Sequence, residues 1–323
     1  MTTKKPIRLV MIGAGGSTGK TTEAVNLACA LAKRKKKKVR YIDGDAQGDG
    51  SQYFHYQDPP YVLGEALGGV EVVPDPAAKT KSGLRPPTLR ELEVPIYRET
   101  AEDAKRLGGI APREPDQAEW LQRLTLVPSG IGSTGATLGS AVTVMERDQL
   151  GSEKALKALN SIDSGRADDE IPDIEIFDLQ GTVGPMTYLA LRWAAAGEND
   201  ESRGRSGAIA VVTPDDKSTG RHLKEARDIV FEVAEFLPIE LIAIIPVRVK
   251  RKQSGRFYVD MLERLQNHDE YGPLVTSTVR EAVYAGESFA AREPLLMWVP
   301  EEEITQDQDR VVDWLIDHKV IVP

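Results

Sequence analysis

The sequence predicts an α/β protein with a doubly wound, mostly parallel sheet flanked by helices. Short apolar runs of strand type alternate along the chain with segments whose apolar residues recur at helical spacing. The first run, Ile7–Ile12, leads into a glycine-rich loop and then a helix. Polar side chains follow several of the runs, where parallel sheets bind their ligands. For 323 residues we expect a single domain over 1–323 with a C-terminal helix at about 305–318.

The expected strands are the short apolar runs, each ending where a polar or glycine-rich stretch begins. They lie at 7–12, 39–43, 124–127, 174–177, 208–212 and 241–245, with further candidates at 274–279 and 295–299. The expected helices have one apolar face each. They lie at 22–31, 61–67, 135–146, 152–159, 185–193, 223–233 and 307–318.

Between 73 and 118 the sequence changes character, because prolines interrupt any long helix or central strand. We expect a proline-rich insertion on the surface and not a separate domain. Long irregular stretches inside α/β domains are usually functional or mobile. The prolines are Pro74, Pro76, Pro86, Pro87, Pro95, Pro112 and Pro115.

Composition argues against several classes of protein. A net charge of −9 is unsuited to coating nucleic acid over the whole surface. The basic run at 33–38 is either a local patch or a solvated helix end. Cys29 is the only cysteine, so neither an intrachain disulfide nor a cysteine-built metal site is expected. Without an apolar stretch of membrane-spanning or signal-peptide type, the expected location is the cytoplasm, with no membrane attachment.

Residues 11–22, Met-Ile-Gly-Ala-Gly-Gly-Ser-Thr-Gly-Lys-Thr-Thr, match the P-loop pattern between a strand and a helix. Glycines let backbone N–H groups approach a nucleotide's phosphates, and the helix dipole favours an anion there. Lys20 offers a positive charge to the β- and γ-phosphates, and the Thr21 hydroxyl can bind Mg²⁺. The predicted phosphate-binding residues are Gly15, Gly16, Ser17, Thr18, Gly19, Lys20, Thr21 and Thr22.

Carboxylates follow two other expected strands, with Asp43 and Asp45 after one and Asp178 after another. Thr21, Asp178 and Asp43 are candidate ligands of a phosphate-bound Mg²⁺, some of them through water. One aspartate of the 43/45 pair can orient or deprotonate the attacking water. The candidate catalytic residues are therefore Asp45, Lys20 and Asp43. The alternative for the Asp-Gly-Asp stretch is a simple turn.

The stretch Asp178-Leu-Gln-Gly181 has a spacing at which a glycine N–H can sense a γ-phosphate. No Asn-Lys-x-Asp sequence, which would bind a guanine base, follows Asp178. ATP is therefore the expected nucleotide, with Mg²⁺ as its metal.

Together these motifs resemble the ParA/MinD family of deviant Walker P-loop ATPases. The chain is most similar to ParA partition ATPases of plasmids and chromosomes without an N-terminal helix-turn-helix domain. Segments 18–28, 41–48, 126–129 and 279–289 look like family segments. The resemblance implies that Lys20 binds phosphate, that Thr21 and Asp178 serve Mg²⁺, and that Asp45 positions the hydrolytic water.

The same resemblance implies a homodimer that forms with ATP and binds DNA non-specifically. Such a protein would be nucleoid-associated and would segregate or position a plasmid, chromosome or other cargo. A ParB-like centromere-binding or adaptor protein would stimulate its hydrolysis. The competing hypothesis is a metabolic ATP-dependent synthetase or ligase on the same fold, acting on a small molecule. A MinD-like membrane helix is not expected, because the final helix is acidic.

The chain departs from the family pattern at the signature lysine, where Gly15 stands. In the family that lysine reaches the partner subunit's nucleotide, and some relatives, including carboxysome-positioning ATPases, supply a lysine from later in the chain. Lys217 is the candidate replacement here, and a solvated loop lysine is the alternative. The family's Asp-x-Pro-Pro is Asp-Leu-Gln-Gly in this chain, which affects how nucleotide and partner are coupled.

A basic patch after the strand at 241–245 is the candidate DNA surface. Its side chains would contact phosphates, which gives sequence-independent, salt-sensitive binding. The alternative is an ordinary basic surface. The predicted DNA-binding residues are Arg248, Lys250, Arg251, Lys252, Arg256, Arg221 and Arg280.

Overall fold

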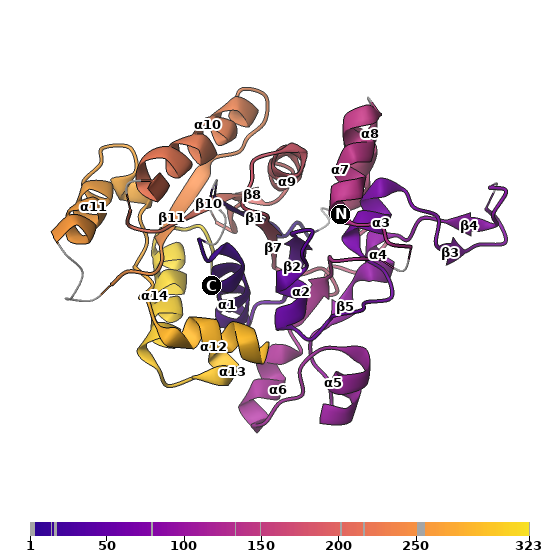
Figure 1. Ribbon diagram of the computed structural model, residues 1–323, viewed down its shortest axis with the longest axis horizontal. Coiled ribbons are helices and arrows are strands. Elements are labelled where there is room, and N and C mark those ends of the chain that lie inside the picture. Colours follow the sequence, from indigo (N-terminus) through magenta and orange to yellow (C-terminus); the bar gives the residue numbers. More distant parts are fainter. Residues whose placement is uncertain are drawn as a thin grey trace.

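The computed structural model describes residues 4–13, 15, 18–78, 80–132, 134–148, 150–200, 202–215, 217–250 and 256–322. Its centre is a seven-stranded sheet in the order β11-β10-β1-β7-β2-β6-β5 (Figure 1). Neighbouring strands pair in parallel, except that β5 is antiparallel to β6. The strands are β1 (Ile7–Ile12), β2 (Val39–Gly44), β5 (Val94–Pro95), β6 (Leu124–Val127), β7 (Ile174–Leu179), β10 (Gly207–Val212) and β11 (Leu241–Pro246). The predicted doubly wound, mostly parallel fold is confirmed.

Helices cover both faces of the sheet. Alternate residues of β1 divide between two cores, Leu9 and Met11 in one and Val10 and Ile12 in the other. The first core is closed by α1 (Lys20–Arg34), α6 (Pro115–Leu121), α13 (Leu295–Trp298) and α14 (Glu303–Asp317). The second is closed by α3 (Leu63–Gly68), α7 (Leu138–Arg147), α8 (Gly151–Asn160), α9 (Pro185–Ala194) and α10 (Leu223–Ala234). Within the described part of the chain, no helix combines the length and the apolar character that crossing a bilayer demands.

Six of the expected strands are present, and β7 continues past its predicted end, so that Asp178 lies within it. The candidates at 274–279 and 295–299 are wrong. Residues 295–298 form α13, because a short run of buried apolar residues satisfies its backbone in a helical turn as well as in a strand. At 274–279, a 3₁₀ turn, η2 (Gly272–Leu274), precedes an isolated bridge between Val275 and Ile244 of β11.

Smaller elements complete the chain. The helix α2 (Asp49–Tyr53) directly follows β2 in sequence, and α12 (Val283–Ala291) directly precedes α13. The π-helix η1 (Lys217–His222) follows β10 and leads directly into α10. The others are α11 (Arg256–Gln266) and the hairpin of β8 (Asn199–Asp200) with β9 (Gly204–Arg205).

The segment at 73–118 holds short elements between its prolines. β3 (Val73–Pro74) and β4 (Leu84–Arg85) form a hairpin that projects at the right of Figure 1. The pairing of β5 with β6 and the full burial of Ile96 attach the segment to the body of the protein. A short edge strand such as β5 is the place in a sheet that tolerates a proline. The remaining helices of this segment are α4 (Leu89–Leu92) and α5 (Ala101–Leu107).

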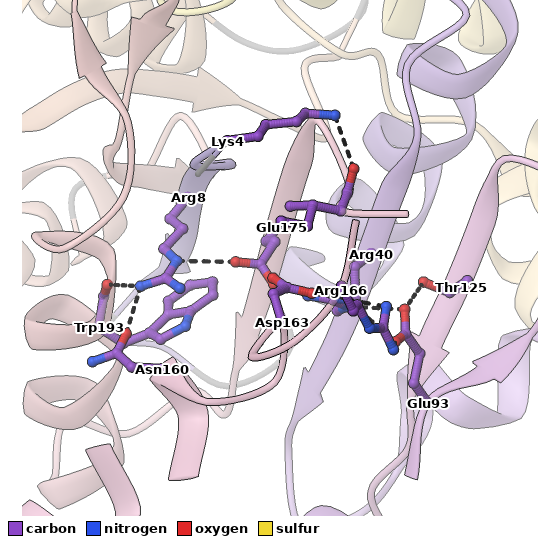
Figure 2. Close-up of polar contacts among 11 residues, drawn as sticks. Lys4, Arg8, Arg40, Glu93, Thr125, Asn160, Asp163, Arg166, Glu175 and Trp193 are labelled. Atoms are coloured by element: carbon purple, nitrogen blue, oxygen red, sulfur yellow. Dashed lines mark hydrogen bonds and ion pairs between the residues drawn. The ribbon is translucent and has the colours of Figure 1, made fainter. Parts of the chain in front are cut away.

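A row of buried charges crosses the sheet (Figure 2). Strand register places Arg8 of β1 and Arg40 of β2 on either side of Glu175 of β7. Glu175 accepts a hydrogen bond from Arg8 Nε at 2.9 Å and contacts the Arg40 guanidinium. Arg40 also donates to Glu93, next to β5, at 3.0 Å. The row therefore ties the 73–118 segment to the centre of the sheet.

Glu175→Gln is expected to lower the free energy of unfolding by roughly 3–5 kcal/mol, because Arg8 would stay buried without a carboxylate partner among the described residues and Arg40 would keep only Glu93 and Asp163. Urea unfolding followed by circular dichroism measures the change. The matched control is Glu119→Gln, which removes an exposed partner of Arg123 and should leave the unfolding free energy nearly unchanged. Equal losses in the two variants would contradict the role given to the buried row.

Candidate active site

The loop between β1 and α1 uses glycine where the backbone is most constrained. Gly19, immediately before α1, has a φ of 89°, in the left-handed region that favours glycine. A side chain at Gly13 would meet the Val211 carbonyl of β10 at 3.2 Å. The loop therefore packs against β10 and ends at a helix N-terminus, whose dipole favours an anion. Gly16 and Ser17 lie outside the described residues.

Lys20 is folded into this loop and is only 5% exposed. Its Nζ donates to the Gly15 carbonyl at 3.0 Å and to Thr18 Oγ1 at 3.4 Å. Burial lowers the pKa of Lys20, while the Asp178 and Asp45 carboxylates act to raise it. The ammonium is thus held inside the loop by a carbonyl that an anionic ligand can replace.

Asp178 lies near the end of β7, opposite Asp43 of β2. Tyr41 donates to its Oδ2 at 2.8 Å, and its Oδ1 is buried without a hydrogen-bond partner among the described residues. Burial raises the pKa of Asp178 to about 6, and the Thr21 and Tyr41 side chains and the Lys20 charge act in the opposite direction. Tyr41 therefore fixes the orientation of the carboxylate through Oδ2, and Oδ1 can bind a metal ion or a water.

An orphaned carboxylate oxygen near a threonine hydroxyl fits a phosphate-bound Mg²⁺, which takes few protein ligands and keeps several waters. Asp178 and Thr21 are the residues that would hold it. Across the described ranges, no three His, Cys, Asp or Glu side chains form a metal cluster by themselves. Oxygens of the nucleotide and water would complete the coordination.

Asp43 anchors the segment that carries Asp45. Its Oδ2 accepts from the backbone N and from the Oγ of Ser51, both at 2.7 Å, and its Oδ1 accepts from the Asp45 N at 3.1 Å. Burial raises the pKa of Asp43 to about 7; the Ser51 hydrogen bonds oppose this and the Asp178 charge adds to it. These bonds make Asp43 a positioning residue for the following loop.

Asp45 itself is half-buried, and its Oδ1 accepts from the Gln47 N at 2.9 Å. Its charge raises the pKa of both Lys20 and Asp178, so it lies near both. A carboxylate beside a phosphate-binding loop is what a positioned attacking water needs. Gly181 is half-buried in the loop after β7.

A cavity of about 220 Å³ adjoins the loop at Gly19 and Thr22. Glu23 and Gln308 line it, joined by a hydrogen bond of 2.8 Å, and each keeps one oxygen without a partner within the described chain. Burial raises the pKa of Glu23 to about 7. A largely apolar cavity with spare acceptors fits the base of a nucleotide bound in the loop. Its apolar lining includes Val247, Val279, Phe289, Leu295 and Ile304.

Of the residues predicted to bind DNA, Arg280 lies away from the open surface, whereas Arg248 is exposed and also lines this cavity. A side chain at Gly19 would come within 3.9 Å of Arg248 Nε. Arg280 is held by Asp307 and Glu303. Because its guanidinium is bound by carboxylates, Arg280 is not part of an open basic surface.

The other predicted DNA-binding residues stay at the surface where the structure describes them. Arg221 and Arg256 are exposed, each paired with an acidic residue one helical turn away, and Lys250 lies over a tyrosine ring. Arg251 and Lys252 fall outside the described residues. Lys217 is exposed at the start of η1.

Comparisons with known proteins agree with this geometry. A family model described as "CobQ/CobB/MinD/ParA nucleotide binding domain" matches residues 9–295. A putative plasmid partition protein from Borrelia burgdorferi bound to AMPPNP is similar in structure, at 16% identity over 97% of this chain and 99% of that chain, with a TM-score of 0.63. An ATP complex of a Cyanothece McdA variant is similar at 14% identity over 99% and 98% of the two chains, with a TM-score of 0.65.

A synthase is also among the similar structures. Cobyrinic acid a,c-diamide synthase from Mycobacterium smegmatis, with a bound ATP analogue and magnesium, shares 15% identity over 97% of this chain and 95% of that chain, with a TM-score of 0.63. No curated protein sequence matches the chain.

Proposed function

This chain belongs to the CobQ/CobB/MinD/ParA nucleotide-binding family, and from that premise we propose that it is an ATP-driven partition or positioning protein. It binds ATP with Mg²⁺, dimerises, and binds DNA non-specifically to segregate or position a plasmid, chromosome or other cargo. The supporting observation is that the Asp45 and Asp178 carboxylates both act to raise the pKa of Lys20, although the three residues come from the loop after β2, from β7 and from α1. A glycine-rich turn that matched the motif by chance would not be expected to have a buried lysine with two carboxylates nearby.

Binding of the triphosphate involves residues from two strand ends. Lys20 exchanges its bond to the Gly15 carbonyl for one to a phosphate oxygen, while Thr21 and Asp178 hold the metal. Mg²⁺, when bound, neutralises charge on the phosphate oxygens. Tyr41 holds Oδ2 of Asp178 and leaves Oδ1 to the metal or its water.

Hydrolysis depends on Asp45, which orients the attacking water and accepts its proton. Asp43, through its bonds to Ser51 and to the Asp45 N, keeps the Asp45 segment in place. A ParB-like centromere-binding or adaptor protein stimulates this step. We expect the protein in the cytoplasm, on the nucleoid.

Tyr41→Phe is expected to raise the Mg²⁺ concentration needed for half-maximal ATP binding by about 10-fold. The phenyl ring keeps the packing but loses the bond to Asp178 Oδ2, and partners of metal ligands typically change metal affinity 10–100-fold. Fluorescent ATP binding titrated with Mg²⁺ measures the shift. Tyr56→Phe is the control, because its hydroxyl bonds the Pro95 carbonyl at 2.7 Å in the 73–118 segment. An unchanged Mg²⁺ requirement in Tyr41→Phe would show that Tyr41 does not position Asp178 for the metal.

The DNA surface of this proposal is the exposed part of the basic stretch after β11. Arg248, Lys250 and Arg256 belong to it, together with Arg251 and Lys252 of the sequence. Each would contact phosphate without reading bases. Doubling the patch in an ATP-bound dimer raises avidity, so a chain with a net charge of −9 can bind DNA only when ATP is present.

Fluorescence anisotropy on two unrelated duplexes of equal length tests the function. We expect binding with ATP and Mg²⁺, equal for both sequences and weakened by salt, and none with ADP. The double variant Lys250→Ala/Arg256→Ala should lose this binding and keep ATP hydrolysis. The control is Arg106→Ala, which removes an exposed cation from α5. Binding to only one of the two duplexes without a need for ATP would contradict the proposal. So would the absence of binding to either duplex.

Lys217 is proposed as the lysine that acts on the partner subunit's nucleotide in place of the missing signature lysine. Its exposed position at the start of η1, the element that follows β10, supports this. Lys217→Ala should then fail to dimerise with ATP in light scattering while binding ATP normally. Normal dimerisation of the variant would rule the assignment out.

A metabolic synthetase or ligase is the second candidate, and the similarity to the Mycobacterium smegmatis synthase supports it. A cavity of about 720 Å³, lined by His55, Glu99, Arg113 and Glu293, could hold a small substrate. None of its lining residues belongs to the P-loop. ATP turnover that depends on a small molecule, and not on DNA or a protein partner, would favour this candidate.

A further inference from the structure

Position 15 has no room for a side chain in this structure. A Cβ built on Gly15 would lie 2.6 Å from His222 Nδ1, 2.7 Å from its Cε1 and 3.1 Å from Thr18 Cγ2. The first two distances are shorter than any van der Waals contact. The ring of His222 therefore occupies the space into which a side chain of residue 15 would extend.

His222 is held there by the elements on both sides of it. It is the last residue of the π-helix η1, a rare geometry that is frequent at functional sites. The start of η1 is fixed because Ser218 N donates to Asp215 Oδ1 at 2.8 Å and Ser218 Oγ accepts from Thr213 N at 3.0 Å. The residue after His222, Leu223, is 1% exposed in the second core. The backbone that carries the His222 ring is thus fixed on both sides.

The Nδ1 atom of His222 is buried and has no hydrogen-bond partner among the described residues. A buried polar atom left unpaired costs roughly 1–3 kcal/mol, so such atoms usually have a reason to be there. On the same residue, Gly15, the carbonyl accepts from Lys20 Nζ at 3.0 Å. An unpaired ring nitrogen and the phosphate-binding lysine therefore both lie against one residue of the P-loop.

We propose that His222 is a phosphate-binding residue of this chain. Its ring takes the place of a side chain at position 15, and Nδ1 donates a hydrogen bond to a phosphate group of the nucleotide in the same subunit. This arrangement requires glycine at position 15, because any Cβ there would overlap the His222 ring. The proposal adds a second contact to the triphosphate beside Lys20 and concerns a different residue from Lys217, which is exposed.

His222→Leu and His222→Asn separate hydrogen bonding from packing. Leucine fills much of the ring's volume without a donor, whereas the asparagine amide can place a donor near the position of Nδ1. We expect His222→Leu to weaken ATP binding about 10- to 100-fold, as for loss of a hydrogen bond to a charged group, and His222→Asn to stay within about threefold of the parent. Calorimetry with ATP, ADP and adenosine measures this. Adenosine, which has no phosphate, should bind all three proteins equally.

A double-mutant cycle tests the packing independently of the donor. Gly15→Ala should weaken ATP binding in the parent chain, because the new methyl group displaces the His222 ring. In a His222→Ala background the same methyl group meets empty space and should cost little further affinity. This arm also gives an answer if His222→Leu does not fold.

Three results would overturn the proposal. The first is His222→Leu binding ATP as tightly as the parent. The second is a loss of adenosine binding as large as the loss of ATP binding, which would indicate a structural role. The third is an equal cost of Gly15→Ala with and without His222.

Discussion

Lys20→Ala is expected to weaken ATP binding by at least about 100-fold and to abolish ATP-dependent DNA binding with it. The ammonium is buried in the loop, 3.0 Å from the Gly15 carbonyl, and buried charge-assisted bonds to phosphate are the strong ones. Loss of two such bonds at roughly 1.5–3 kcal/mol each accounts for the size of the effect.

The control for Lys20→Ala is Lys224→Ala, which removes an exposed cation from α10 and should bind ATP as the parent does. Competition against a fluorescent ATP analogue measures both variants. If Lys20→Ala kept ATP affinity within a few fold of Lys224→Ala, the P-loop would not be the nucleotide site.

Asp45→Asn is expected to lower the rate of hydrolysis by about 10²–10⁴-fold, the usual contribution of a general base. ATP binding should persist, because Lys20, Thr21 and Asp178 are intact. The variant should therefore accumulate in the ATP-bound form and stay on DNA after the parent protein has been released. Single-turnover hydrolysis and DNA dissociation, measured on one preparation, check both parts.

Asp49→Asn is the matched control for Asp45→Asn. Asp49 begins α2 in the same segment, and burial together with the Asp45 charge raises its pKa. The Asp49→Asn protein should hydrolyse ATP at nearly the parent rate. Equal losses in the two variants would mean that the segment, and not the Asp45 carboxylate, supports hydrolysis.

The P-loop and the aspartates were predictable because their signals are local in sequence. Residues 7–12 and 174–177 are apolar runs that end at functional groups, and parallel strands bring their carboxyl ends to one edge. The same reasoning failed at 295–299, where three buried apolar residues form a helical turn. Short apolar runs of this kind do not distinguish strand from helix.

Tyr41 and His222 were not predictable, because each acts through a contact distant in sequence. Tyr41 meets Asp178 only through the register of β2 and β7. His222 meets Gly15 only because a π-helix turns it toward the loop. Arg280 shows the converse, since its basic character indicated a DNA contact and Asp307 of α14 holds it instead.

The central claim is that the loop joining β1 to α1 binds ATP with Mg²⁺, and calorimetric titration of the purified protein tests it most directly. The account predicts one saturable site per chain with MgATP, and loss of that site in Lys20→Ala. No heat of binding at millimolar MgATP, or the same binding in Lys20→Ala, would contradict it.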